Sequence, residues 1–357
     1  MTELFYRFVS RKIFLVALFA MSAIVGGIPA ASAAGFTVQQ ISSPGPAMRM
    51  SNNGAVTGFY VAKCTTLSSQ PKRTICYNAP WLFDGKRVSK LSGSWPSNSN
   101  AKAVAVNDAL DLVGADINGA WFYSKGNVDY VDGTGTNSTG SRLFAINNNG
   151  VAIGMSSLGG IYQPFTYQFN GVPSPTLSPG NVAVDINDAG MITGWYKNAS
   201  NVEQSFISAD GVNINDIPNL APTINCRPVR ISQVNPTTGS VWVAGNCSGN
   251  RPFLYEITSG SLKDLSYPNS SNLSIVSVNS QGVAVGTAVK PGANAPDGYT
   301  AILWPAGSAT PIDLNANQAF APATAWNVHA TDINEAGTVL TGYNDTSGNF
   351  YTFLLHF

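Results

Sequence analysis

Charged residues and histidines are scarce in this sequence, which limits the chemistry that it can perform. Asp, Glu, Lys and Arg make up 11% of the 357 residues, and His329 and His356 are the two histidines. The motifs of a serine-hydrolase nucleophile, a zinc protease, a phosphate-binding loop and a dinucleotide-binding site are all absent. We therefore assign no catalytic residue, and the sequence favours a non-catalytic role.

An excess of positive charge is also lacking. The chain has 19 basic and 19 acidic residues, and removal of residues 1–33 takes away three basic and one acidic residue, leaving 16 against 18. A nucleic-acid-binding domain normally shows a basic excess on one face. We therefore do not expect a nucleic-acid partner.

The first 33 residues have the pattern of a signal peptide. Basic residues in "RFVSRK" at 7–12 precede an apolar run at 13–27, and "ASA" at 31–33 supplies small residues for cleavage. A membrane anchor is the alternative, but the run is short for a span and ends in glycines. We expect residues 34–357 to be one exported domain, periplasmic or extracellular, without a membrane span after cleavage.

The four cysteines agree with export, because an oxidising compartment favours disulfides. Four cysteines allow three connectivities. Proximity in the sequence favours the pairs Cys64–Cys76 and Cys226–Cys247. The C-x-x-C spacing typical of zinc sites does not occur. We therefore expect no metal site and no cofactor. The acidic turns "VDG" at 131–133 and "NDTSG" at 344–348 could bind calcium weakly, although turn formation explains them equally well.

A repeat runs through the whole mature chain. Its mark is an apolar residue followed by Asn, and copies recur every 40–56 residues, the length of a propeller blade. The copies are Val106-Asn107, Ile146-Asn147, Ile186-Asn187, Val234-Asn235, Val278-Asn279 and Ile333-Asn334, with Met50-Ser51 as a degenerate first copy. The Asn begins a tight turn, usually closed by Gly, that joins two alternating strands.

Each copy continues with a third and a fourth strand. The third carries an apolar or aromatic pair at period two, such as Trp121/Tyr123 or Phe165/Tyr167, which we interpret as packing between blades. A turn glycine and a short fourth strand follow. The last copy stops after its third strand, "YTFLLHF", whereas the mature N-terminus "AGFTVQQI" resembles a lone fourth strand. We predict a seven-bladed β-propeller of four-stranded blades, closed by pairing of these ends, with six or eight blades as alternatives.

The pattern apolar-Asn-x-x-Gly-x-Val-x-Gly, followed by an aromatic-rich strand and Gly, resembles the extracellular HAF-repeat proteins of bacteria. The first half matches well at Ile146–Gly154, Ile186–Gly194, Val278–Gly286 and Ile333–Gly342. The His-Ala-Phe trio of that family appears here as "QPF", "QSF", "RPF" or "TAI". The resemblance implies an exported repeat protein of propeller shape, and it brings no catalytic residues with it.

Long, unequal loops are expected on one face of the ring, after the second and fourth strands. They include Phe59–Ala79 and the stretches at 93–102, 288–299 and 315–326. Binding residues usually lie on variable loops held by a rigid scaffold. We predict a ligand face here, with Trp95 and Trp326 as stacking platforms, although either tryptophan could instead anchor its loop. Lys72 and Arg73, inside the Cys64–Cys76 loop, could clamp a partner, or the disulfide could simply protect that loop.

A weaker candidate site lies in the inner strands, two residues before each turn. These positions are Arg49, Ala105, Ala145, Asp185, Gln233, Ser277 and Asp332. Arg49, Asp185 and Asp332 could bind a polar ligand or ion in the central channel, with channel water around scattered charges as the alternative.

Three functions follow from this pattern. The first is a monomeric, non-catalytic module that binds a glycan or an extracellular protein. The second is a secreted carbohydrate-active hydrolase or lyase, in which Asp111 or Asp116 would act together with Asp332. The third is a structural protein of a surface layer or matrix.

Overall fold

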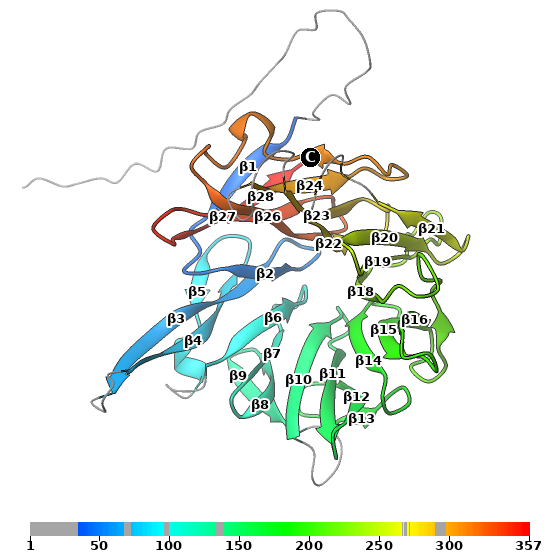
Figure 1. Ribbon diagram of the computed structural model, residues 1–357. Helices are drawn as coiled ribbons and strands as arrows, with labels where there is room; N and C mark the ends of the chain where they lie inside the picture. Colours follow the sequence, from blue (N-terminus) through cyan, green and yellow to red (C-terminus); the bar gives the residue numbers. More distant parts are fainter. Residues whose placement is uncertain are drawn as a thin grey trace, which may run out of the picture.

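The computed structural model describes residues 35–357 except 68–72, 96–99, 133–138, 266, 268, 269, 271 and 290–297. The described residues form seven four-stranded antiparallel sheets arranged as a ring (Figure 1). They contain no α-helix and two short 3-10 turns, η1 (Ser92–Ser94) and η2 (Ala316–Gln318). The predicted seven-bladed β-propeller is confirmed.

Blades 1–6 each contain four strands in the order of the chain, from the centre outward, and blade 7 takes its outer strand from the N-terminus. Blade 1 comprises β2 (Ala47–Met50), β3 (Val56–Leu67), β4 (Arg73–Phe83) and β5 (Val88–Lys90). Blade 2 comprises β6 (Lys102–Val106), β7 (Leu112–Asp116), β8 (Gly119–Ser124) and β9 (Asn127–Val131). Blade 3 comprises β10 (Thr139–Ile146), β11 (Ala152–Leu158), β12 (Ile161–Tyr167) and β13 (Ser174–Pro175).

The second half of the ring repeats this order. Blade 4 comprises β14 (Val182–Ile186), β15 (Ile192–Lys197), β16 (Glu203–Ser208) and β17 (Asn215–Asp216). Blade 5 comprises β18 (Cys226–Ile231), β19 (Trp242–Cys247), β20 (Arg251–Glu256) and β21 (Ser261–Asp264). Blade 6 comprises β22 (Leu273–Val278), β23 (Ala284–Val289), β24 (Tyr299–Trp304) and β25 (Ile312–Asp313). Blade 7 comprises β26 (Trp326–Ile333), β27 (Val339–Asn344), β28 (Phe350–His356) and β1 (Thr37–Ile41).

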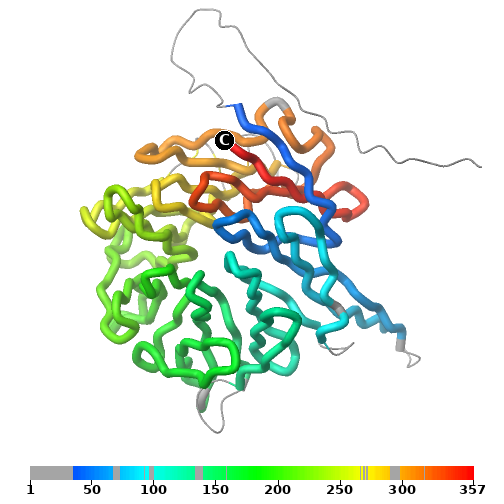
Figure 2. Tube along the Cα trace, turned by 180° about the vertical axis from the view of Figure 1, so that it is seen from behind, coloured from blue at the N-terminus to red at the C-terminus, as the bar shows by residue number. Residues whose placement is uncertain are grey.

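The ring is closed by the N-terminal strand, as predicted. β1 pairs antiparallel with β28 over five residues, from Thr37 opposite His356 to Ile41 opposite Thr352. The two strands lie side by side in Figure 2. A hydrogen bond of 2.8 Å between the hydroxyls of Ser43 and Thr352 extends the joint beyond the strand. Pairing satisfies the backbone groups that both strands would otherwise expose at a sheet edge.

Aromatic residues of the third strands fill the spaces between blades. Those that are fully buried include Trp81, Trp121, Phe165, Phe206, Phe253 and Trp304. Each of the first five faces a glycine of the second strand, as Phe206 faces Gly194. A Cβ on Gly194 would lie 2.1 Å from the carbonyl oxygen of Val182 and 2.6 Å from the Phe206 ring. The glycine that ends "MITG" and its counterparts is therefore required by close packing.

A β-bulge interrupts every inner strand. In all seven blades the register between first and second strand shifts by one residue, as between Ala183 and Asp185 in blade 4. A bulge bends the strand and redirects the side chains that follow it. We call the residue after each bulge the post-bulge position. These are Arg49, Ala105, Ala145, Asp185, Arg230, Ser277 and Asp332.

One expected loop is a pair of strands. The segment Phe59–Ala79 was predicted as a long loop, but β3 continues to Leu67 and β4 begins at Arg73. The resulting hairpin projects from the ring at the lower left of Figure 1. Its sequence "YVAKCTT" opposite "RTICYNA" is rich in β-branched and aromatic residues, which explains why it pairs.

Both predicted disulfides are present, and their environments differ. Cys64–Cys76 joins directly paired residues of the projecting hairpin, and both cysteines are exposed. Cys226–Cys247 joins directly paired residues of β18 and β19, and these cysteines are 1% and 5% exposed.

Candidate functional site

The two ends of the ring are built differently. Turns between first and second strands, and between third and fourth strands, open on one end, which we call the turn face. Connections between second and third strands, and from one blade to the next, open on the other end, which we call the long-loop face.

A belt of asparagines joins the blades at the turn face. The side-chain oxygen of Asn147 accepts from the backbone N–H groups of Asn149 (3.1 Å) and Val151 (2.9 Å), as the sequence predicts for a turn. Its amide nitrogen also donates to the carbonyl of Asn187 in the next blade (3.0 Å). Equivalent bonds between blades are donated by Asn107, Asn187, Asn235, Asn279 and Asn334. The sequence did not predict the bond from the Asn amide nitrogen to the next blade, because this bond depends on which blades are neighbours.

One predicted inner-strand position in blade 5 is wrong. The sequence pattern gave Gln233, counted back from Asn235, but the post-bulge residue is Arg230. Ser232 takes the place of the belt asparagine, and its N–H donates to the carbonyl of Trp242 (2.9 Å). Asn235 begins a separate turn within the inserted segment, closed by Ser240. The sequence "RIS" at 230–232 matches "RMS" at 49–51, and this match could have identified Arg230 as the equivalent of Arg49.

The structure brings the predicted Asp185 and Asp332 together through Arg230. The Nη2 atom of Arg230 lies 3.2 Å from Oδ2 of Asp332, and its Nε atom lies 3.7 Å from Oδ2 of Asp185. Both aspartates are almost fully buried, at 3% and 0% exposed. The Nη1 atom of Arg49 is buried without a hydrogen-bond partner among the described residues. The charges of Arg49, Asp185, Arg230 and Asp332, on blades 1, 4, 5 and 7, therefore meet in the interior.

Burial controls the protonation of this cluster. It raises the pKa of Asp185 to about 6, while the charge of Arg49 and the hydrogen bond from Ile231 oppose the rise. It also raises the pKa of Asp332, again opposed first by Arg49. A carboxylate that loses its hydration stays ionised only where cations and N–H groups replace the lost water.

The two predicted tryptophans differ in exposure. Trp95 is 6% exposed and packs on the rings of Trp121 and Tyr123, with ring centroids 4.8 and 5.6 Å apart. Its expected exposure is wrong, and it anchors its loop. Trp326 is 39% exposed at the start of β26. Arg73 is exposed at the start of β4, and Lys72 lies outside the described residues.

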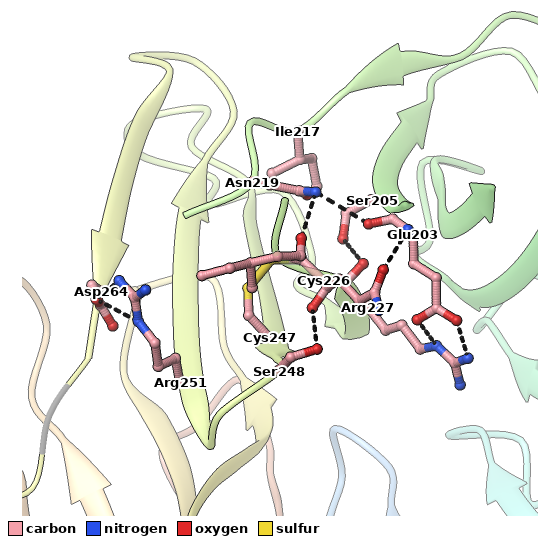
Figure 3. Close-up of a disulfide and its surroundings, with 12 residues drawn as sticks. Glu203, Ser205, Ile217, Asn219, Cys226, Arg227, Cys247, Ser248, Arg251 and Asp264 are labelled. Atoms are coloured by element: carbon pink, nitrogen blue, oxygen red, sulfur yellow. Dashed lines mark hydrogen bonds and ion pairs between the residues drawn. A yellow bond between two sulfur atoms is a disulfide. The ribbon is translucent and has the colours of Figure 1, made fainter. Parts of the chain in front are cut away.

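A patch that the sequence did not reveal crosses blades 3, 4 and 5 on the long-loop face. Arg227 lies over the ring of Trp195, 4.1 Å from its centroid. Arg227 also forms two hydrogen bonds with Glu203 (Figure 3). The Arg227 side chain is 53% exposed. Tyr162 of blade 3 is 45% exposed and lies within electrostatic range of Arg227. We call Tyr162, Trp195, Glu203 and Arg227 the arginine–aromatic patch.

Fixed backbone groups hold this patch in place. Cys226, the residue before Arg227, is tied by its disulfide, and its carbonyl accepts from the Ser205 hydroxyl (3.0 Å). The side chain of Asn219 donates to the carbonyl of Glu203 (3.1 Å), and Asn225 accepts from its N–H (2.9 Å). These tethers order the guanidinium before any ligand arrives.

A weak sequence repeat could have predicted this patch, because a similar pair of a cation and an aromatic ring occurs elsewhere in the ring. A cation also covers the aromatic residue after the second-strand glycine in blade 1, where Lys102 lies 4.8 Å from the centroid of the Phe59 ring. In both cases the cation comes from the first or second residue of the next blade's inner strand.

The carboxylates suggested for catalysis lie in different parts of the fold. Asp111 is in the turn that precedes β7, and Asp116 is at the opposite end of that strand, bound to Tyr130 (2.8 Å). Asp332 is fully buried in the central cluster. Asp345 in "NDTSG" closes a turn with Ser347 and Asn349. Within the described ranges there is no group of three or more His, Cys, Asp or Glu residues suited to a metal ion.

Comparisons with known proteins support the fold. No protein-family model and no curated protein sequence matches the chain. Among solved structures, an oligogalacturonate lyase from Vibrio parahaemolyticus is 10% identical with a TM-score of 0.50, covering 91% of this chain and 94% of that chain. YCF48 bound to D1 peptide is 11% identical with a TM-score of 0.54, covering 92% and 97%. A puromycin hydrolase is 9% identical with a TM-score of 0.53, covering 91% and 52%.

These likenesses establish the propeller scaffold alone, since all three identities are low. In the part of the chain that is described, no helix is both long and apolar enough to cross a membrane. The two disulfides are compatible with export.

Proposed function

We propose that this protein is an exported, non-catalytic binding module that holds a protein ligand on its long-loop face. The observation that carries the proposal is the arginine–aromatic patch. Arg, Tyr and Trp are the residues most enriched at the energetic centres of protein interfaces. Here Arg227 and Tyr162 are exposed, Trp195 is half-buried beneath the guanidinium, and a buried disulfide holds the residue next to Arg227.

Exposed apolar side chains on the long-loop face favour a protein over a glycan. Those at the long-loop face are Val61, Ile75, Ile117, Ile161, Tyr162, Trp326 and Phe350, whereas Val172, Val212 and Val234 lie on the turn face. Aliphatic side chains gain from contact with another apolar surface and offer little to a sugar hydroxyl. YCF48, whose fold is similar, is described with a bound peptide. The resemblance of the repeat to HAF-repeat proteins supports export.

The test is a binding comparison between the two faces. Residues 34–357 would be screened by surface plasmon resonance against purified secreted proteins and polysaccharides of the source organism, together with Arg227→Ala, Tyr162→Ala and the turn-face control Lys125→Ala. We expect a protein ligand whose affinity falls at least tenfold in the two patch variants and stays unchanged in the control. Equal binding by all variants would remove the patch from the site. Saturable binding to a polysaccharide alone would replace the protein partner by a glycan.

A further inference from the structure

A polar cavity lies at the turn-face end of the central channel. Its volume is about 50 Å³, and its lining includes Asp185 and Arg230 together with Asp188, Gln233 and Glu335 from the turns. All seven blades contribute to the wall. At about 10–15 Å³ per water on this measure, it has room for roughly three to five water-sized groups.

The charge of the lining is negative. Three carboxylates, those of Asp185, Asp188 and Glu335, line it together with the guanidinium of Arg230. With Arg49 and Asp332 of the buried cluster included, four carboxylates stand against two guanidinium groups. The surrounding turn face has the same sign. Its acidic residues are Asp84, Asp108, Asp111, Asp188, Asp210, Glu256 and Glu335, and its basic residues are Lys86, Arg87 and Lys125. A concave site of this charge concentrates small cations.

The repeat places Asp185 and Asp332 in equivalent surroundings that differ by one donor. Each aspartate follows a bulge. In the next blade the post-bulge residue is an arginine, and the aspartate accepts a hydrogen bond from the backbone N–H of the residue after that arginine. Asp332 accepts from Met50 (2.9 Å), and Asp185 accepts from Ile231 (3.0 Å), both through Oδ2. The preceding blade supplies the difference. Ser277 donates its hydroxyl to Oδ1 of Asp332 (2.6 Å), whereas the equivalent residue before Asp185 is Ala145.

The consequence is that the buried carboxylate of Asp185, which also accepts from the backbone of Ile186, has one hydroxyl donor fewer than that of Asp332. The side chain of Asp185 is 4% exposed and lines the cavity, and its direct contacts with Ile231 and Arg230 are both made by Oδ2. A buried acceptor gains from a hydrogen bond and loses free energy without one. A ligand with N–H donors would therefore complete Asp185 as Ser277 completes Asp332.

We propose that this cavity is a binding site for an alkylammonium group, the chemistry shared by a lysine side chain and a polyamine. The ammonium supplies the positive charge that the lining requires and three N–H donors, one of them for Oδ1 of Asp185. Asp188 and Glu335, each accepting two hydrogen bonds from neighbouring turns, keep lone pairs for the others. The volume of about 50 Å³ has room for the ammonium and the first methylene groups of its chain.

The test uses residues 34–357 and n-butylammonium chloride, titrated at constant ionic strength and followed by thermal unfolding and calorimetry. We expect saturable binding with a rise in Tm. n-Butanol, which lacks the charge, and tetramethylammonium, which lacks N–H donors, should produce neither. No saturable binding, or an equal effect of n-butanol, would overturn the proposal, and so would a preference for calcium.

Two variants locate the site. Ala145→Ser restores the donor found next to Asp332 and should weaken n-butylammonium binding at least tenfold in a folded protein. Asp185→Asn removes the charge with little change of shape and should also weaken n-butylammonium binding at least tenfold. This second variant is needed because the hydroxyl added by Ala145→Ser could disturb packing. The control Asp210→Asn, at an exposed turn away from the cavity, should bind as the parent does. Unchanged affinity in both cavity variants would refute the assignment.

The source of the ammonium is distinguished by two further ligands. Cadaverine and Nα-acetyl-lysine amide present the same group, free or on a peptide unit. Tighter binding of cadaverine would identify a polyamine site, and tighter binding of the lysine derivative would identify a site for a protein side chain. Failure of this site would leave the long-loop proposal intact, because the two sites lie on opposite faces.

Discussion

Blade 4 carries the same turn at both ends, in two different environments. At the turn face, Asn187 begins a turn closed by Met191, and its side-chain oxygen accepts the Met191 N–H (3.0 Å). At the long-loop face, Asn198 begins a turn closed by Val202, and its side-chain oxygen accepts the Val202 N–H (3.1 Å). Asn187 also donates to Ser232 of the next blade and is fully buried, whereas Asn198 is half-buried and has no such bond among the described residues.

The comparison separates what a turn requires from what a ring requires. Local hydrogen bonding explains both asparagines as turn residues. The additional bond to the next blade is made on one face only, and there the turns share one pattern. On the long-loop face the bonds between blades that the described residues make, such as those of Asn78 with Asn100 and of Asn246 with Ile275, follow no common pattern, and there length and composition vary. A ligand-binding surface can therefore change without disturbing the belt that holds the blades together.

The disulfides extend this comparison and should show the largest effect. We expect Cys226→Ala/Cys247→Ala to lower the free energy of unfolding by about 4 kcal/mol, because it removes a native cross-link and leaves space in a buried cluster. Cys64→Ala/Cys76→Ala should lower it by about 1 kcal/mol, since the exposed hairpin contributes little to the core. Urea denaturation of both variants measures the difference, and equal losses would show that burial is irrelevant to either bond.

The two asparagines provide the most closely matched test. Asn187→Ala leaves the Met191 N–H and the Ser232 carbonyl without a partner in the interior, so we expect a loss of about 3 kcal/mol. Asn198→Ala removes the same turn bonds at the surface, where water replaces them, and should cost about 0.5 kcal/mol. Chemical denaturation gives both values. Similar costs would mean that the bond between blades adds nothing to the turn.

Asp185 and Asp332 form the third matched pair, and pH separates the two positions. Burial raises the pKa of Asp185 to about 6 from 3.8, so the native state binds this proton more tightly than the unfolded chain. Its contribution to stability is present below about pH 4 and is lost as pH rises through 6.

Replacing Asp185 by Asn removes this pH dependence. Relative to the parent protein, Asp185→Asn should gain stability by about 2 kcal/mol between pH 4.5 and pH 7.5. Asp332→Asn is the comparison, because it also disturbs the contacts with Ser277, Met50 and Arg230 and should be destabilising at both pH values. Urea titrations at the two pH values decide this. Parallel curves for the parent and Asp185→Asn would contradict the assigned pKa.

Local pattern was enough to predict the fold from the sequence. The apolar-Asn pair, the second-strand glycine and the third-strand aromatics each have a local cause that repeats in every blade, as Gly194 facing Phe206 illustrates. The ring joint was also predictable, because the strand missing from one end of the sequence is present at the other.

The candidate sites were less predictable, because they depend on contacts between blades. Trp95 looks like an exposed loop residue until Trp121 and Tyr123 of blade 2 are placed beside it. The stack of Arg227 on Trp195 joins residues of different blades. In blade 5, an Asn inside the insertion imitated the repeat, so Arg230 was missed although Asp185 and Asp332 were found.

The pairing of β1 with β28 has a consequence for how the protein is made. The first strand of the ring to be synthesised is the partner of the last, so β1 keeps an unpaired edge until the final blade has been translated. A chain cut short before β28 would present two unpaired edges, and such edges promote aggregation and proteolysis. The ring therefore closes only in a chain that includes β28, and shorter products keep the unpaired edges that mark them for degradation.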